Sequence, residues 1–291
     1  MRKSKYLILS GFYFDFNDEL SKIIEIKKSF EKQNILDLYR FDDIDNLYIF
    51  KNKNIYFLYL SKIFSAAYNL SFSSNQIKVL DLSQCINLKF KESDFFVENQ
   101  IKYFRFPKNI DTINCNKILY NNIDILDLSQ CKKLKSIDEY SFFNNEIKKL
   151  KLSDNIEIIK KCAFLSNQIE ILDLSQCINL KYIGGASFEA NKIKQLKLPK
   201  NIEIIDNFAF SNNQIEILDL SNCIKLKEIK NASFGHNPLK EIKILDNIEI
   251  EYYNYLNDND KWNKFCEYYK NNKEKSGDYK LENDKWKWYS L

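Results

Sequence analysis

The feature that most constrains this fold is an internal repeat of 46 residues. The phrase Gln-Ile-Glu-Ile-Leu-Asp-Leu-Ser-Gln-Cys at 168–177 returns at 214–223 with one substitution. Counted from the first Ile of this phrase, the copies start at Ile77, Ile123, Ile169 and Ile215. A shorter version lies between them and starts at Ile55, Ile101, Ile147, Ile193 and Leu239. The chain therefore alternates units of about 24 and about 22 residues, a length typical of stacked repeats.

Each unit begins with an I-x-x-L-x-L phrase and continues to a second apolar cluster. In the unit that starts at Ile193, Leu196 and Leu198 fall on one side of a strand, since side chains alternate along strands. A single unit cannot bury this apolar side alone, but stacked neighbours form one continuous core. The repeat therefore predicts a solenoid with a parallel sheet.

The short unit resembles the BspA-like (Treponema-type) leucine-rich repeat, whose consensus is L-x-x-L-x-L-P-x-x-L-x-x-I-x-x-x-A-F. The residues that match it in order are Leu196, Leu198, Pro199, Ile202, Ile205, Ala209 and Phe210. The long unit is similar to a cysteine-containing leucine-rich pattern, and together the two resemblances cover about residues 55–250. They imply an α/β-type repeat solenoid: a right-handed superhelix with a parallel β-sheet on its concave face and short strands or 3-10 turns on its convex face.

A solenoid needs caps over its terminal apolar layers, which divides the chain into three parts. Residues 1–54 are expected to form an N-terminal cap, with a strand at 6–14, a helix at 15–34 and a degenerate repeat at 35–54. Residues 55–256 are the solenoid. Residues 257–291 are expected to form a C-terminal cap of one helix and one hairpin.

In the C-terminal part, Asp258 or Asn259 is expected to begin a helix and Gly277 to end it. Its buried side would hold Trp262, Phe265, Cys266 and Tyr269, and a hairpin would follow at 279–289. This segment is also similar to a small aromatic module that follows such repeats in some bacterial proteins, so a docking module is the alternative to a cap.

Stacking turns each position of the unit into a column along the solenoid. Eight residues after the first Ile, cysteine and asparagine alternate: Cys85, Asn109, Cys131, Asn155, Cys177, Asn201, Cys223 and Asn247. We expect the asparagines to be buried and to hydrogen-bond the backbone of adjacent turns. Cysteines two strands apart are too distant for a disulfide, which favours structural free thiols.

Two further columns belong to the exposed side of the sheet. Four residues after the first Ile, acidic and basic residues alternate: Asp81, Arg105, Asp127, Lys151, Asp173, Lys197, Asp219 and Lys243. This pattern predicts an ion ladder, which either orders the stack or contacts a charged ligand. Two residues after the first Ile, the N-terminal copies are apolar or aromatic, which predicts an apolar N-terminal half of the face. Its candidate ligand contacts are Phe57, Tyr59, Tyr103 and Arg105.

The charge and hydropathy patterns narrow the class of partner. The net charge is +4, from 44 Lys and Arg against 40 Asp and Glu, and the two signs are interleaved, which argues against nucleic acid. No stretch approaches the ~20 apolar residues of a membrane helix. The apolar run at 6–14 is interrupted at Ser10 and Gly11, so it reads as a strand and not as an export signal. These features favour the cytoplasm, whereas the resemblance implies the cell surface or secretion.

The sequence contains no recognisable catalytic constellation. A triad would have to use the single histidine, His236, which falls on a surface loop. Gly184-Gly185 lacks the strand–loop–helix context of a nucleotide site, and the cysteines are too widely spaced for zinc. We therefore expect a monomeric, non-enzymatic scaffold without cofactor or metal that binds a protein or peptide on its concave face. The alternative is a structural or surface-display spacer.

Overall fold

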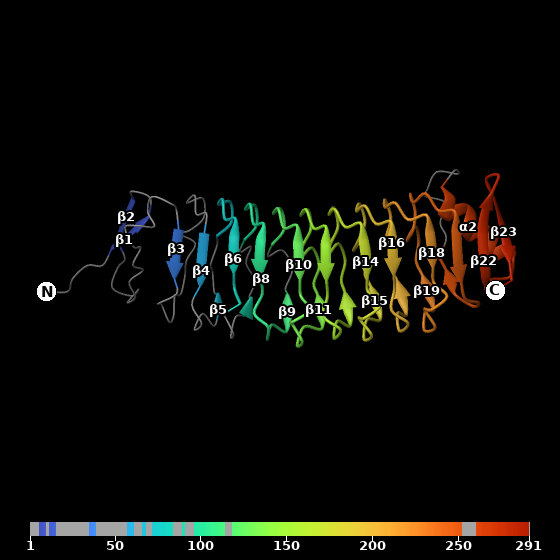
Figure 1. The fold of residues 1–291 in the computed structure, drawn as a ribbon, viewed down its shortest axis with the longest axis horizontal. Coiled ribbons are helices and arrows are strands. Elements are labelled where there is room, and N and C mark those ends of the chain that lie inside the picture. Colours follow the sequence, from blue (N-terminus) through green and yellow to red (C-terminus); the bar gives the residue numbers. More distant parts are fainter. Residues whose placement is uncertain are drawn as a thin grey trace.

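The computed structural model describes residues 72–83, 96–113, 118–251 and 260–290 in full. It also gives the backbone of six other strands: β1 Tyr6–Leu9, β2 Phe12–Asp15, β3 Ile35–Leu38, β4 Phe57–Leu60, β5 Ala66–Ala67 and β7 Lys89–Phe90. Figure 1 shows the strands stacked in two rows along the long axis, with the last helix and hairpin at one end. This is the parallel-strand solenoid that the repeat predicts.

The first row of strands carries the L-x-L phrases, and we call its solvent side the LxL face. After β3 and β4 it contains β6 Val79–Asp81, β8 Tyr103–Arg105, β10 Ile125–Asp127, β12 Lys149–Lys151, β14 Ile171–Asp173, β16 Gln195–Lys197, β18 Ile217–Asp219 and β20 Glu241–Ile244. The pairing register follows the repeat, with Asp173 opposite Lys197 and Asp219 opposite Lys243. The columns read from the sequence are therefore confirmed for these pairs.

The second row is a continuous, seven-stranded parallel sheet of two-residue strands. It consists of β9 Thr112–Ile113, β11 Ser136–Ile137, β13 Ile158–Ile159, β15 Tyr182–Ile183, β17 Ile204–Ile205, β19 Glu228–Ile229 and β21 Glu249–Ile250. The sequence analysis predicted either short strands or 3-10 turns on this side of the solenoid, and the structure has short strands.

A column of phenylalanine rings fills the core between the two rows. Phe164, Phe188 and Phe210 are fully buried, and successive ring centroids lie 5.1 and 5.5 Å apart with nearly parallel planes. Phe234 continues the stack, and Trp262 of the C-terminal segment packs against it at 5.0 Å. Burying large aromatic side chains in a continuous column is a major source of stability for a fold with few helices.

A buried asparagine holds each turn to the next. These residues lie two positions before the first Ile of a unit: Asn75, Asn99, Asn121, Asn145, Asn167, Asn191, Asn213 and Asn237. The Asn191 side chain donates to the carbonyl of Phe164 in the preceding turn and to that of Phe188 in its own turn, and it accepts the N–H of Ile169. Backbone groups that the turns would leave unpaired are thereby satisfied.

The asparagines eight residues after the first Ile, which were expected to be buried, form a different column that is partly exposed. Asn155 and Asn201 do donate to the carbonyls of Lys132 and Ile178 in the preceding turn, at 2.8 and 2.7 Å. Both side chains are only partly buried, and Asn247 is exposed. The expectation of a buried asparagine was wrong for these three positions, although the cysteines that alternate with them in the column are buried.

The cysteines of the same column behave as predicted. Cys131, Cys177 and Cys223 are buried free thiols. Burial raises the pKa of Cys131 and Cys177 to about 11 and that of Cys223 to about 12, and nearby aspartates add to the shift. Cys85 lies outside the described residues.

The C-terminal segment continues the solenoid with different elements. Helix α2 spans Lys261–Asn271, and its buried side holds Trp262, Phe265, Cys266 and Tyr269 as predicted. The capping residue is Asp260, whose carboxylate accepts the N–H groups of Trp262 and Asn263. Gly277 does not end the helix, which stops at Asn271; instead it begins strand β22.

Strands β22 Gly277–Glu282 and β23 Lys285–Tyr289 form the predicted hairpin. Asn283 and Asp284, the two residues between them, both have positive φ, as a tight two-residue hairpin turn requires. Strand β22 pairs antiparallel with β20, so the hairpin extends the sheet of the LxL face beyond the last repeat.

The N-terminal strand prediction needs a correction. The run at 6–14 is not one strand: β1 and β2 pair antiparallel, with residues 10–11 between them. The interruption at Ser10 and Gly11 therefore separates two strands. β3 pairs in parallel with β4, so the degenerate repeat predicted at 35–54 contributes a strand to the first row. The helix predicted at 15–34 does not begin at Asp15, which ends β2; the rest of that range lies outside the described residues.

Candidate binding face

From β8 towards the C-terminus, the hydrogen-bond ladder of the LxL face is interrupted at regular intervals, whereas β4 and β6 are paired. β10 pairs with β12, β14 with β16, and β18 with β20, but β8 and β10, β12 and β14, and β16 and β18 are not hydrogen-bonded neighbours. Each of these three breaks follows a short unit, so they recur with the 46-residue period. The second row of strands has no such break between β9 and β21.

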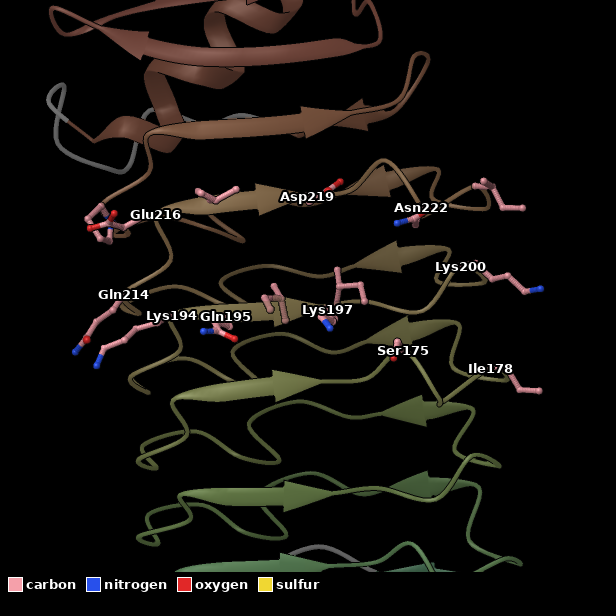
Figure 2. A pocket seen from close by; sticks show the side chains of 15 residues that line it. Ser175, Ile178, Lys194, Gln195, Lys197, Lys200, Gln214, Glu216, Asp219 and Asn222 are labelled. Carbon is pink, nitrogen blue, oxygen red and sulfur yellow. The ribbon is translucent and has the colours of Figure 1, made fainter. Parts of the chain in front are cut away.

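Each break coincides with a shallow groove on the LxL face. The groove between β16 and β18 is the largest, at ≈ 1180 Å³, and those at β12–β14 and β8–β10 measure ≈ 740 and ≈ 750 Å³. Figure 2 shows the first of these, with Gln195 and Lys197 on one strand and Asp219 on the next. The three grooves therefore occupy equivalent positions in successive repeats.

The breaks expose part of the hydrophobic layer beneath the sheet. Leu126, Leu172 and Leu218 of the long-unit strands are buried, whereas Leu150 and Leu196 of the short-unit strands are only partly buried against the core. Leu150 and Leu196 also line the grooves at their strands. An apolar floor with polar edges is typical of sites that bind other molecules.

An exposed isoleucine lies on one edge of each groove. Ile125, Ile171 and Ile217 have 54%, 59% and 56% of their surface accessible. Their equal exposure corrects the prediction that only the N-terminal half of the face is apolar. The sequence analysis placed these isoleucines in the right column. Because charged residues such as Lys149 and Glu241 alternate with them, it did not predict that the isoleucines are exposed along the whole described face.

A basic residue lies on the opposite edge of each groove, and in two of the grooves it forms an ion pair with an aspartate of the preceding strand. Arg105 pairs with Asp81 and Lys197 with Asp173, each at 3.7 Å across an intact part of the ladder. The predicted ion ladder is thus present for these two pairs. It is not continuous, because Lys243 pairs instead with Glu241 of its own strand.

The aspartates of this ladder have a second role that the sequence analysis missed. Asp127, Asp173 and Asp219 each accept the N–H of the serine two residues later, at 2.9 to 3.0 Å. The Ser129 and Ser175 bonds lower the pKa of Asp127 and Asp173, against the opposing effect of burial. The recurring Asp-Leu-Ser sequence forms the turn that takes the chain off the strand.

Two of the four predicted ligand contacts lie together at the groove between β8 and β10. Tyr103 is 62% exposed, and Tyr103 and Arg105 line this groove with Ile125. Its floor is aromatic, since Phe104 and Phe106 contact each other at 4.3 Å. Phe57 and Tyr59 lie on β4, with their backbones opposite Val79 and Asp81; their side chains lie outside the described residues.

Neither a metal-binding cluster nor a membrane-spanning helix is found in the described part of the chain. There, no three His, Cys, Asp or Glu side chains gather as metal ligands would, and no helix is long and apolar enough to cross a bilayer. His236 is about half exposed, and its backbone N–H donates to Asp260 at 2.7 Å, which joins the last complete turn to α2. The loop position predicted for His236 is confirmed.

Comparison with known proteins agrees with the repeat register. Residues 135–263 match the family model of the BspA type leucine-rich repeat region, in six copies. A search of curated proteins finds no significant match to this chain.

Proposed function

We propose that this chain, a BspA-like leucine-rich repeat protein over residues 135–263, is a non-enzymatic scaffold that binds a protein or peptide on its LxL face. Leucine-rich repeat solenoids are generally protein-interaction scaffolds, and members of this family are typically not enzymes. The observation that carries the proposal is the set of three grooves at the breaks of the strand ladder.

The chemistry of the grooves favours a polypeptide. Each combines an apolar floor, an exposed isoleucine on one edge and charged side chains nearby, as at Leu196, Ile217 and Lys197. Protein interfaces use this combination of apolar contact and surrounding polar groups. The exposed isoleucine and the partly exposed leucine at a break offer apolar contacts to a bound polypeptide, and the charged side chains beside them offer polar contacts.

The groove at β8–β10 is the best candidate for the dominant contact. It alone among the three grooves has Tyr and Arg side chains on its edge, at Tyr103 and Arg105. Tyr and Arg supply a large share of the binding energy in protein interfaces. The other two grooves would extend the contact along the solenoid.

Cross-linking tests which face is used, because lysines are present on both sides. A partner captured from lysate is expected to form amine cross-links to Lys149, Lys151 and Lys197 on the LxL face. Cross-links confined to Lys161 and Lys181, which are exposed away from that face, would contradict the proposal. Failure to capture any partner would also contradict it and would favour the spacer.

A further inference from the structure

A second, chemically different groove lies on another side of the solenoid. We call this side the asparagine flank: the turns that carry the buried asparagines and lead from the second row of strands back to the first. The groove is ≈ 460 Å³ and is lined mainly by Tyr120, Asn122, Asn144, Glu146, Ser166 and Gln168. We propose that it binds a neutral oligosaccharide.

The groove arises from a gradient of side-chain size along one column. The residue before each buried asparagine has positive φ, at 55° for Tyr120, 52° for Asn144, 57° for Ser166 and 54° for Ala190. Because the four backbones share one conformation, their side chains leave equivalent turns in the same direction. The decrease in size from Tyr120 to Ala190 produces a wall at one end and an open floor at the other.

The wall of this groove is an exposed aromatic ring. Tyr120 is 43% exposed, and an edge contact with Phe143, at 5.3 Å between centroids, holds its ring. Tyr140 also makes an edge contact with Phe143, at 6.0 Å between centroids. The C–H face of a pyranose packs against such a ring, because the ring face carries partial negative charge.

The remaining lining consists of amides, a hydroxyl and one carboxylate. Asn122 donates to Glu146 at 2.7 Å, which fixes both side chains and leaves the second carboxylate oxygen of Glu146 available to accept from a sugar hydroxyl. Gln168 occupies the equivalent position in the next turn. Amides both donate and accept, as the vicinal hydroxyls of a sugar also do.

The charge of the groove distinguishes its ligand from that of the LxL face. Glu146 is the only carboxylate among the residues that line it, and the lining includes no Lys, Arg or His. An anionic sugar, a phosphate or a nucleic acid would therefore find no counter-charge there. The small apolar contribution likewise disfavours a hydrophobic peptide.

The buried asparagines make this groove rigid before a ligand arrives. Asn121, Asn145 and Asn167 each hydrogen-bond to carbonyls of two successive turns directly beneath it. A preorganised site loses less conformational entropy on binding.

Titration with neutral and acidic oligosaccharides tests the proposal. Purified protein would be examined with cellohexaose, chitohexaose, xylohexaose and maltohexaose, and with hexagalacturonic acid as the anionic control, by saturation-transfer NMR and calorimetry. At least one neutral sugar is expected to bind, and the acidic one is not. Absence of binding to every neutral sugar overturns the proposal, as does preference for the acidic sugar.

Substitutions locate the site. Tyr120→Ala is expected to weaken binding by about tenfold or more, and Tyr120→Phe to retain it, since the ring face is kept. Glu146→Ala, at an exposed position, supplies a second variant that is expected to weaken binding without affecting folding. The matched control Tyr103→Ala removes an aromatic side chain from the LxL face and should leave sugar binding unchanged. Binding that survives both Tyr120→Ala and Glu146→Ala contradicts the assignment.

Discussion

The side-chain oxygen of Asn167 accepts the backbone N–H of Ile147, 20 residues earlier in the chain, at 3.0 Å. Its amide nitrogen donates to the carbonyls of Phe142 and Phe164 at 2.9 and 3.1 Å. One side chain thus connects successive turns of the solenoid. The same arrangement recurs at Asn99, Asn121, Asn145, Asn191, Asn213 and Asn237, so this ladder joins successive turns of the described solenoid.

Replacing Asn167 with Ala is expected to destabilise the protein by about 3 kcal/mol, because buried backbone groups of Ile147 and Phe142 lose their partners. Urea unfolding followed by circular dichroism measures the change. The matched control is Asn201→Ala, which removes a single side-chain bond from a partly exposed asparagine and should cost less than about 1 kcal/mol. Equal effects at the two positions would show that the buried ladder does not hold the turns together.

The strand register could be predicted from the sequence, whereas the choice of buried asparagine column could not. A 46-residue period places Asp173 beside Lys197 once strands stack, and the structure has this pair. Two asparagine columns share that period, one before the strand and one after it. Which column is buried depends on the path of the turns, and the period does not specify that path.

The candidate site could also be predicted only in part. Tyr103 and Arg105 were predicted as ligand contacts from the aromatic N-terminal part of the exposed face, and they line one groove. The grooves themselves result from missing strand pairing between units, as between β12 and β14. Spacing between neighbouring backbones is set by packing in three dimensions, and the pattern of hydrophobic residues does not reveal it.

The raised thiol pKa values predict a loss of stability in alkali. Burial disfavours the thiolate and raises the pKa of these cysteines from 9.0, to about 11 for Cys131 and Cys177 and to about 12 for Cys223. Above about pH 9 the unfolded chain loses these protons while the folded chain keeps them, so the free energy of unfolding falls as pH rises towards about 11.

Urea unfolding at about pH 8 and about pH 10 measures this effect, with a variant carrying Ala at all three positions as control. The decrease in stability should be larger for the wild type than for the variant. An identical pH dependence in the two proteins would mean that the thiols are not shielded from solvent.

Asp260 is expected to be the main polar connection between the repeats and helix α2. Asp260→Ala removes the helix cap and the acceptor for the His236 N–H, and should lower stability by about 1 to 2 kcal/mol. Glu267→Ala changes an exposed carboxylate of the same helix and should have little effect. Thermal unfolding of both variants tests the difference.

Deleting residues 257–291 tests whether the C-terminal segment is a cap. The deletion would expose Phe234 and the edge of β20, so we expect a lower melting temperature and self-association. A truncated protein that remains soluble, monomeric and equally stable would contradict the cap and favour a docking module.

The binding face is tested most directly by comparing the affinity of one captured partner for three forms of the protein. The forms are the wild type, Tyr103→Ala with Arg105→Ala on the LxL face, and Tyr120→Ala with Lys161→Ala as a matched change away from that face. The LxL variant is expected to bind at least about tenfold more weakly, and the control to match the wild type. Unchanged affinity in the LxL variant, or a loss confined to the control, would contradict recognition through the LxL face.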